Sequence, residues 1–309
     1  MSSYEYCVVD AFAAQPFTGN PAGVVLEADG LSDEQMRQIA AEVNASETTF
    51  VLPPTQSQAA VRFRWFSPTQ EVNMCGHAML AGVHALLEAG RFVTEMREPG
   101  AILPIETQAG VLTARTYQQD QPDKQCVIWL DLVRPRFTRK SINQAKLAKL
   151  LGTQFEVLDV TRPPQITQDG DLIVSVKGYA ELLTMQPHFA ELGEFCRQNG
   201  IRGVCTTTTA TLAATMVAQS RFFAPAVGID EDPVTGSVHG PLAVYLLEHG
   251  AVSAAKDEVY MECVQAKPGV QGRAGLVRIV ATRREGGEYD VRIGGTCVTT
   301  LRGQVVSMP

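Results

Sequence analysis

One pattern of residues occurs twice in this chain of 309 residues. The first copy runs from Arg64–Pro68 (RWFSP) through a short acidic loop to Gly76 and then enters an apolar stretch. The second copy runs from Arg221–Pro225 (RFFAP) through an acidic loop to Gly236, and its apolar stretch ends in a second glycine after the same number of residues. Each copy predicts a strand, an acidic loop, a glycine turn and a helix, so we expect two similar domains.

The two glycine turns have the features of anion-binding sites. Glycine lets a ligand approach the backbone closely, and the first amide groups of a helix have no partner within that helix. We therefore expect the two helix starts, at Gly76 and Gly236, to form one anion pocket. The stretches 78–87 and 238–247 contain few polar side chains, so each helix is predicted to be the buried axis of its own domain.

Composition and charge limit the classes of function. With 45% hydrophobic and 19% charged residues, the chain can bury two cores of ordinary domain size. Its net charge of −7 and its pI near 5.3 give no electrostatic reason to expect nucleic-acid or membrane partners. Seven scattered cysteines without a Cys-x-x-Cys spacing favour a reducing compartment. Because no basic leader or long apolar run is present, we expect a cytoplasmic protein.

The order of predicted elements indicates an α+β fold. Strands are expected at 4–12 and 22–26, followed by a helix that Ser32 caps and that ends near Asn44. Glu47 then falls at the junction between this helix and the next strand, where a side chain can point into a cleft. The polar loop 118–123 is the expected boundary between a domain of residues 1–120, joined by the last strand at about 295–309, and a domain of residues 121–294.

The second half repeats this order before it becomes mostly β-structure. A helix capped by Ser141 is expected to run through Leu151, and a second helix should run from His188 to Asn199. The stretch 211–223 is rich in strand-forming residues. Further strands are expected at 258–265, 276–281, 289–293 and 297–306. Helices and strands do not alternate throughout, so a doubly wound parallel sheet is disfavoured.

Five segments resemble the signature blocks of the PhzF-like phenazine biosynthesis family, which shares the diaminopimelate epimerase fold. These blocks are Asp10–Phe12, Phe17–Ala22, Ser46–Val51, Cys75–Ala78 and Gly228–Ser237. The resemblance implies two pseudo-symmetric domains, each an antiparallel sheet or barrel around a central apolar helix, with the active site in the cleft between them. It also implies an isomerase without metal or organic cofactor, and we expect a homodimer.

Carried over by position, the resemblance assigns the site residues. Glu47 takes the place of the family's general acid/base glutamate, and His77 and Asp232 complete the expected catalytic group. The expected substrate-binding residues are Gly76, Gly236, Ser237, Asn20 and Ser46. The implied substrate is a small molecule that carries a carboxylate and is cyclic or amino-bearing.

The chemistry explains these residue types. Moving a proton between carbon atoms needs a carboxylate that acts first as a base and then as an acid, and a dry cleft favours this role. The charge that develops on the substrate needs donors already in place, which two helix starts supply. Racemases of this fold use one cysteine from each half. Cys75 occupies the first of these positions, but the second half has no cysteine in Asp232–Thr235, so a two-thiol mechanism is disfavoured.

Other readings of the same residues remain open. The chain is alternatively a non-catalytic binder of small anions on the same fold. Taken alone, a glutamate at a strand start is more often solvated or ion-paired than catalytic. His77 and His84 lie on one helix face, but no third ligand follows at a known spacing, so no metal is expected. Cys75 is as much a small buried hydrophobic residue as a reactive thiol.

Overall fold

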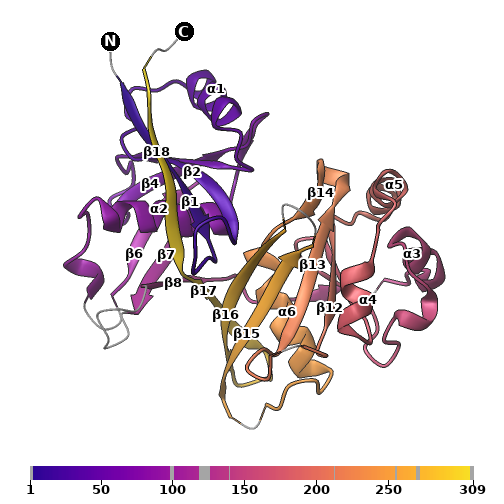
Figure 1. Cartoon of the computed structure of the whole chain (residues 1–309). Helices are drawn as coiled ribbons and strands as arrows, with labels where there is room; N and C mark the ends of the chain where they lie inside the picture. Colours follow the sequence, from indigo (N-terminus) through magenta and orange to yellow (C-terminus); the bar gives the residue numbers. More distant parts are fainter. Residues whose placement is uncertain are drawn as a thin grey trace. The chain divides into compact units, whose positions relative to one another are not determined.

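The computed structural model describes residues 3–97, 101–117, 126–138, 140–211, 213–254, 256–268 and 272–306. Figure 1 shows the course of the chain. Two compact units are present: Met1–Asp131 together with Gly294–Pro309, here called unit 1, and Leu132–Ile293, here called unit 2. The expected boundary loop, 118–123, lies outside the described residues.

Unit 1 is a mixed sheet that surrounds one helix. Its elements are β1 (Tyr4–Ala11), β2 (Asn20–Val25), α1 (Asp33–Val43), β3 (Thr48–Leu52), β4 (Val61–Phe66), β5 (Glu71–Val72), α2 (Gly76–Glu88), a 3₁₀ turn (Glu95–Arg97), β6 (Leu103–Thr107), β7 (Gly110–Tyr117), β8 (Val127–Asp131) and β18 (Cys297–Val305). The strands pair in the order β18-β1-β2-β3-β4-β6-β7-β8, and β5 pairs with β4. All these pairs are antiparallel except β2 with β3 and β4 with β6.

Unit 2 repeats that plan. Its elements are β9 (Phe137–Thr138), α3 (Gln144–Leu150), a 3₁₀ turn (Phe155–Val157), β10 (Gln165–Thr167), β11 (Asp171–Ser175), α4 (Tyr179–Thr184), α5 (Phe189–Asn199), β12 (Gly203–Thr208), β13 (Ala218–Ala224), a 3₁₀ turn (Pro225–Val227), β14 (Ile229–Asp232), α6 (Gly236–Glu248), β15 (Glu258–Lys267), β16 (Arg273–Arg283) and β17 (Tyr289–Gly295). Here too an antiparallel order is interrupted by two parallel pairs, β11 with β12 and β13 with β15. The internal repeat inferred from sequence is therefore a repeat of strand pairing as well.

The helices α2 and α6 are the buried axes of their units, as predicted. Every residue of α2 from Gly76 to Val83 is buried, and so is every residue of α6 from Val238 to Leu247. In unit 1, α2 packs against β1, β2 and β3. The approach is close because a Cβ at Gly82 would lie 2.8 Å from the ring of Phe63. Apolar burial on all sides of the helix therefore fixes the first turn of α2, where the candidate site residues lie.

The helix α1 has the predicted ends. The Ser32 hydroxyl accepts a hydrogen bond from the Gln35 amide, and the Gln35 side chain accepts one from the Ser32 amide, which together form a capping box. At the other end, Asn44 adopts a left-handed backbone conformation with φ of 53°. This turn ends the helix and leads the chain directly to Glu47.

Two local predictions in unit 2 need correction, and some elements were not predicted. The helix expected after Ser141 begins only at Gln144, because the Asn143 side chain accepts a hydrogen bond from the Lys146 amide and so acts as the cap. Within 211–223, the strand begins only at Ala218. The hydroxyl of Thr211 donates to nearby backbone carbonyls, which favours a turn there. The helix α4 and the short strands β9 and β10 were not predicted.

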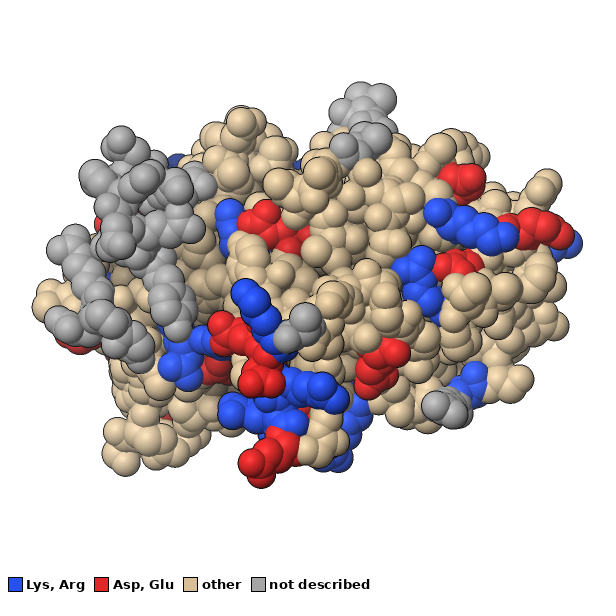
Figure 2. All heavy atoms as spheres, turned by 90° about the horizontal axis from the view of Figure 1, so that it is seen from below, with Lys and Arg blue, Asp and Glu red and all other residues tan. Residues whose placement is uncertain are grey.

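The charged side chains are mixed on the face shown in Figure 2. Blue Lys and Arg side chains lie beside red Asp and Glu side chains there, and no large area of one sign is visible. The described part of this face shows no extended basic surface of the kind that binds a phosphate backbone. None of the helices in the described residues is long and apolar enough to cross a bilayer.

Candidate active site

Glu47 is held by its backbone at the start of β3. Its carbonyl accepts a hydrogen bond of 3.0 Å from the Gly23 amide, which belongs to the neighbouring strand β2. Two residues further on, the Thr49 hydroxyl donates to the Ala78 carbonyl in the first turn of α2, at 2.8 Å. These contacts fix the short segment that carries Glu47 relative to the start of α2. The Glu47 side chain is 16% exposed.

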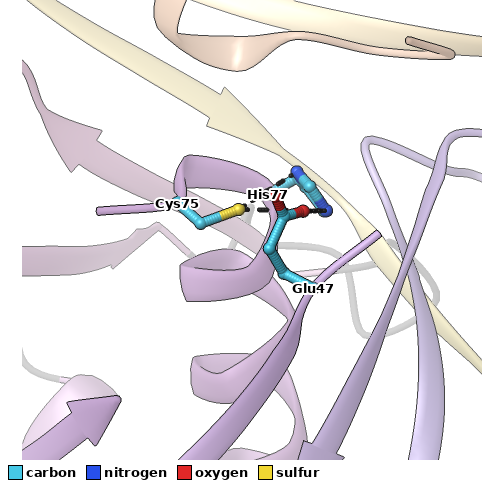
Figure 3. Close-up of side chains that lie close together, drawn as sticks. All are labelled: Glu47, Cys75 and His77. Atoms are coloured by element: carbon cyan, nitrogen blue, oxygen red, sulfur yellow. Dashed lines mark hydrogen bonds and ion pairs between the residues drawn. The ribbon is translucent and has the colours of Figure 1, made fainter. Parts of the chain in front are cut away.

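His77 lies in the first turn of α2 and faces Glu47. Its Nε2 atom is 3.3 Å from Glu47 Oε2 and 3.1 Å from the Ser46 hydroxyl oxygen. The other ring nitrogen, Nδ1, lies 3.4 Å from Cys75 Sγ. Figure 3 shows the carboxylate and the thiol both pointing toward the imidazole. A histidine between two groups that exchange protons is suited to relay a proton or to orient the carboxylate.

One oxygen of the Glu47 carboxylate is buried without a hydrogen bond to any described residue. Glu47 Oε2 is shielded from solvent, and within the described part of the chain it has no hydrogen bond of good geometry. Its contact with His77 Nε2 is an ion pair only when the imidazole is protonated. A shielded carboxylate oxygen without a hydrogen bond is costly to maintain, and such costs concentrate at sites that bind a ligand or a proton.

The start of α2 is open to an anion. Cys75 is the N-cap residue, but its side chain makes no capping hydrogen bond, and the first turn contains no acidic residue. The helix α1, in contrast, has a full capping box and two acids in its first turn. Gly76 is buried, yet a Cβ placed on it would meet no heavy atom within 4 Å. The helix start therefore combines amide groups that lack a side-chain cap with space beside the backbone.

In unit 2, Asp232 and the start of α6 are tied together by one buried glutamine. Gln265 is fully buried; its Oε1 accepts from the Thr235 amide at 2.9 Å, and its Nε2 donates to the Asp232 carbonyl at 2.7 Å. The Thr235 hydroxyl in turn donates to the Asp232 carboxylate. Asp232 ends β14, and Gly236 begins α6. This network fixes the position of the carboxylate at the turn before Gly236.

Ser237 accepts a hydrogen bond from a cation that sequence reasoning missed. The Arg202 guanidinium donates to the Ser237 hydroxyl at 3.2 Å and forms a bidentate pair with Asp171 at 2.8 and 2.5 Å. Burial raises the pKa of Asp171, and the guanidinium opposes that shift. Arg202 lies two residues after the left-handed Gly200, as Ser46 lies two residues after the left-handed Asn44, and this correspondence appears only in the structure.

The structure brings part of the predicted set together within each unit. In unit 1, Ser46, Glu47 and His77 are in direct contact, and Gly76 immediately precedes His77. Asn20 is buried at the start of β2, where its backbone pairs with Ala11. In unit 2, the turn between Asp232 and Ser237 contains Gly236. The substrate-binding and catalytic roles of these eight residues stay predictions.

Cys75 belongs to the group around Glu47 more closely than its sequence position indicated. One ligand atom each of Glu47, Cys75 and His77 lies within 4.8 Å of the others, and these side chains could hold a metal ion. His84, which the sequence places on the same helix face as His77, has its Nε2 atom 3.3 Å from Glu88 Oε1. Helical spacing does not indicate this group, because Glu47 lies at the start of β3 and not on α2.

A separate pocket lies over β1, β2 and β18. It has a volume of about 300 Å³ and is lined by residues that include Glu5, Cys7 and Arg302. None of the predicted site residues lines it. The candidate site is therefore identified by its residue types and not by the volume of a pocket, because the groups suited to proton transfer lie around His77.

Comparisons with known proteins agree with the resemblance. The model of the family described as phenazine biosynthesis-like protein (PhzC-PhzF) matches residues 9–303. The trans-2,3-dihydro-3-hydroxyanthranilate isomerase of Pseudomonas chlororaphis is 31% identical, covering 98% of this chain and 99% of the relative. A Bacillus anthracis phenazine biosynthesis protein of the PhzF family superposes with a TM-score of 0.85 at 28% identity, covering 99% of this chain and 100% of the other. A hydroxyproline epimerase from Agrobacterium vitis shares the fold, with a TM-score of 0.62 at 15% identity, covering 99% of this chain and 91% of the other.

Proposed function

Because the chain belongs to the phenazine biosynthesis-like (PhzC-PhzF) family and is an isomerase, we propose that it moves a proton between carbon atoms of a small carboxylate-bearing metabolite. Glu47 is the general acid/base of this proposal. The observation that carries it is the Glu47 carboxylate, shielded and without a hydrogen bond on Oε2, held 3.3 Å from His77. Such a carboxylate is available to take a proton from a ligand.

In the proposed reaction, one glutamate acts twice. The Glu47 carboxylate removes a proton from a substrate carbon, and the electron pair left behind moves into the conjugated carboxylate of the substrate. Glu47 then returns the proton at another carbon. His77 contacts Ser46, Glu47 and Cys75, so it keeps the carboxylate oriented and stabilises its changing charge.

The first turn of α2 is the proposed site for the substrate's negative charge. Its amide groups lack a side-chain cap, and the open space beside Gly76 lets a carboxylate approach the backbone. Hydrogen bonds from fixed amides strengthen as charge develops, which lowers the barrier rather than only tightening binding. We further propose that Asp232 and Ser237 bind amino or hydroxyl groups of a substrate, and that Asn20 contributes to binding.

The class of substrate follows from the relatives. The Pseudomonas chlororaphis relative is named for its action on a dihydro-hydroxyanthranilate, which is a cyclic carboxylate with amino and hydroxyl groups. We propose a cyclic or amino-bearing carboxylate for this chain as well. Neutral molecules of the same shape are expected to bind poorly, because the open helix start favours an anion.

Proton exchange with solvent tests the proposal directly. The protein is incubated in deuterated water with a panel of small cyclic carboxylates, and the carbon skeleton is analysed by NMR and mass spectrometry. An isomerase that uses one exchangeable acid/base group is expected to introduce deuterium at carbon. A ligand that binds but gains no deuterium and does not rearrange would instead support a non-catalytic anion binder.

A further inference from the structure

The group formed by Glu47, Cys75 and His77 has the donor set of a zinc site. It offers one thiol sulfur, one imidazole nitrogen and one carboxylate oxygen, all within 4.8 Å of one another. Sulfur and imidazole ligands favour Zn²⁺ over Mg²⁺ or Ca²⁺, which prefer oxygen ligands only. With a thiolate and a carboxylate present, the two negative charges would balance the charge of the metal ion.

The distance between Glu47 and His77 matches a metal ion bound at His77 Nε2. In a tetrahedral site with bonds of about 2.0–2.3 Å, neighbouring ligand atoms lie about 3.3–3.6 Å apart. Glu47 Oε2 lies 3.3 Å from Nε2, and Cys75 Sγ lies 3.9 Å from Nε2. Cys75 Sγ lies nearer to Nδ1, at 3.4 Å, so the imidazole or the thiol has to rotate for all three ligand atoms to surround a metal ion on Nε2. The Glu47 oxygen involved is the one that is shielded and has no hydrogen bond of good geometry in the described residues.

We propose that Glu47, Cys75 and His77 form a binding site for Zn²⁺, with a fourth position left for water or a ligand. On binding, the thiol loses its proton to solvent and the sulfur coordinates the metal ion. As an extension that rests on the proposed function, the bound ion occupies the carboxylate oxygen that would otherwise accept a proton. Zinc is then an inhibitor of the isomerase rather than its cofactor.

Cobalt is the probe for the site because its spectrum reports a sulfur ligand. Titration of the full-length protein with Co²⁺ is expected to produce a thiolate-to-cobalt charge-transfer band, which Zn²⁺ then abolishes by displacement. Cys75→Ser is expected to remove the band and to weaken Co²⁺ binding more than about tenfold. Glu47→Gln is expected to keep the band but to weaken binding, which keeps the test informative if the cysteine variant folds poorly.

Cys126 provides the matched control. Among the described cysteines, Cys126 is the one that is partly exposed to solvent and the others are buried. Its thiol is therefore the most accessible to adventitious metal. Cys126→Ser is expected to leave the band and the Co²⁺ affinity unchanged. A band that survives Cys75→Ser, or that disappears with Cys126→Ser, would overturn the proposed site.

Proton exchange separates this proposal from the proposed function. The loss of exchange is expected to be proportional to the amount of Zn²⁺ added. One equivalent should abolish exchange, and a chelator should restore it. If the cobalt band behaves as expected but exchange continues at full rate with one equivalent of Zn²⁺, the metal site stands and the role of Glu47 as the acid/base fails.

Discussion

The two copies of the repeat share their supports but not their reactive groups. In unit 1, Arg64 pairs with Glu71 at 2.7 Å; in unit 2, Arg221 pairs with Glu231 at 2.8 Å. Each guanidinium also lies over the ring of the phenylalanine two residues further on, at 5.1 Å and 4.8 Å from its centroid. The scaffold of strand, acidic loop and helix is therefore preserved in detail, while the residues that face the helix start differ.

The register of the strands shows what stands in place of Glu47. In unit 1, Thr48 pairs with Phe66 on β4; in unit 2, Val204 pairs with Phe223 on β13, and Phe66 and Phe223 are equivalent in the repeat. The residues before them, Glu47 and Gly203, are therefore equivalent. A Cβ at Gly203 would lie 2.4 Å from the ring of Phe222. The Phe222 ring thus occupies the space where unit 1 carries its carboxylate, so the position of the proposed base is not repeated in unit 2.

The largest expected effect comes from removing the proposed base. Glu47→Gln keeps the shape of the side chain but cannot exchange a proton, so turnover is expected to fall by about 10²–10⁴-fold with little change in ligand affinity. Cys75→Ala is expected to be mild, because unit 2 supplies no second thiol at Thr235, the position equivalent to Cys75. Deuterium exchange in both variants is the measurement. Activity that survives Glu47→Gln but is lost in Cys75→Ala would point to a thiol acting with another base.

The second prediction compares the two arginines that support the repeat. Arg221 and Glu231 have side chains that are 5% and 7% exposed, and Arg221 also donates to the Met185 carbonyl at 2.8 Å. Arg221→Met leaves a buried carboxylate unpaired and is expected to cost about 3–5 kcal/mol of unfolding free energy. Arg64→Met is expected to cost about 1 kcal/mol, because the Arg64–Glu71 pair is more exposed to water. Urea unfolding of both variants measures the difference, and equal losses would contradict the comparison.

The third prediction concerns His239 on α6, a histidine that has no counterpart at the equivalent position of α2. His239 is fully buried, with Nδ1 2.8 Å from the Thr235 carbonyl oxygen and Nε2 3.2 Å from the Ser220 hydroxyl. The equivalent residue on α2 is Met79. Burial lowers the pKa of His239 from 6.5 to about 4. As the pH falls through 6.5, the unfolded chain binds a proton that the folded chain does not, so stability decreases with acidification until the pH reaches about 4.

This titration is expected to cost about 2 kcal/mol of unfolding free energy between pH 7 and pH 5. His239→Met introduces the residue that unit 1 has at the equivalent position. It should remove the fall in unfolding free energy between pH 7 and pH 5, whatever its effect on stability at neutral pH. Urea unfolding at several pH values gives the slope. A variant with the same acid slope as the parent chain would show that another group causes it.

Sequence predicted the elements whose signals are local. The capping box at Ser32 and the two apolar helices are properties of neighbouring residues, and the structure confirms them. The helix start at Asn143 was missed because both Ser141 and Asn143 are good caps, and only the hydrogen bond to Lys146 decides between them. Local signals thus specify that an element exists better than they specify where it begins.

Sequence predicted less of the site, because contacts there join distant segments. The family resemblance named Glu47 and His77, but the closeness of Cys75 to both depends on the packing of β3 against α2. Arg202 was missed because nothing near it in the sequence marks a site. When the two copies are aligned, Arg202 corresponds to Ser46 and Ser237 corresponds to His77. The contact of Arg202 with Ser237 is therefore equivalent to the contact of Ser46 with His77.

The smallest expected effects come from the two serines of these matched contacts. Ser46→Ala removes a hydroxyl 3.1 Å from His77 Nε2, so it should act on the proton-transfer step and lower kcat. Ser237→Ala removes a hydroxyl 3.2 Å from Arg202, which keeps its bidentate pair with Asp171, so the fold should be undisturbed and the change should appear in KM. A single hydrogen bond is worth about 0.5–1.5 kcal/mol, so each effect is expected to be about two- to tenfold. Steady-state kinetics of both variants on one substrate separates the roles. A lower kcat for Ser237→Ala with unchanged KM would place part of the chemistry in unit 2 and contradict the proposal that Ser237 serves binding only.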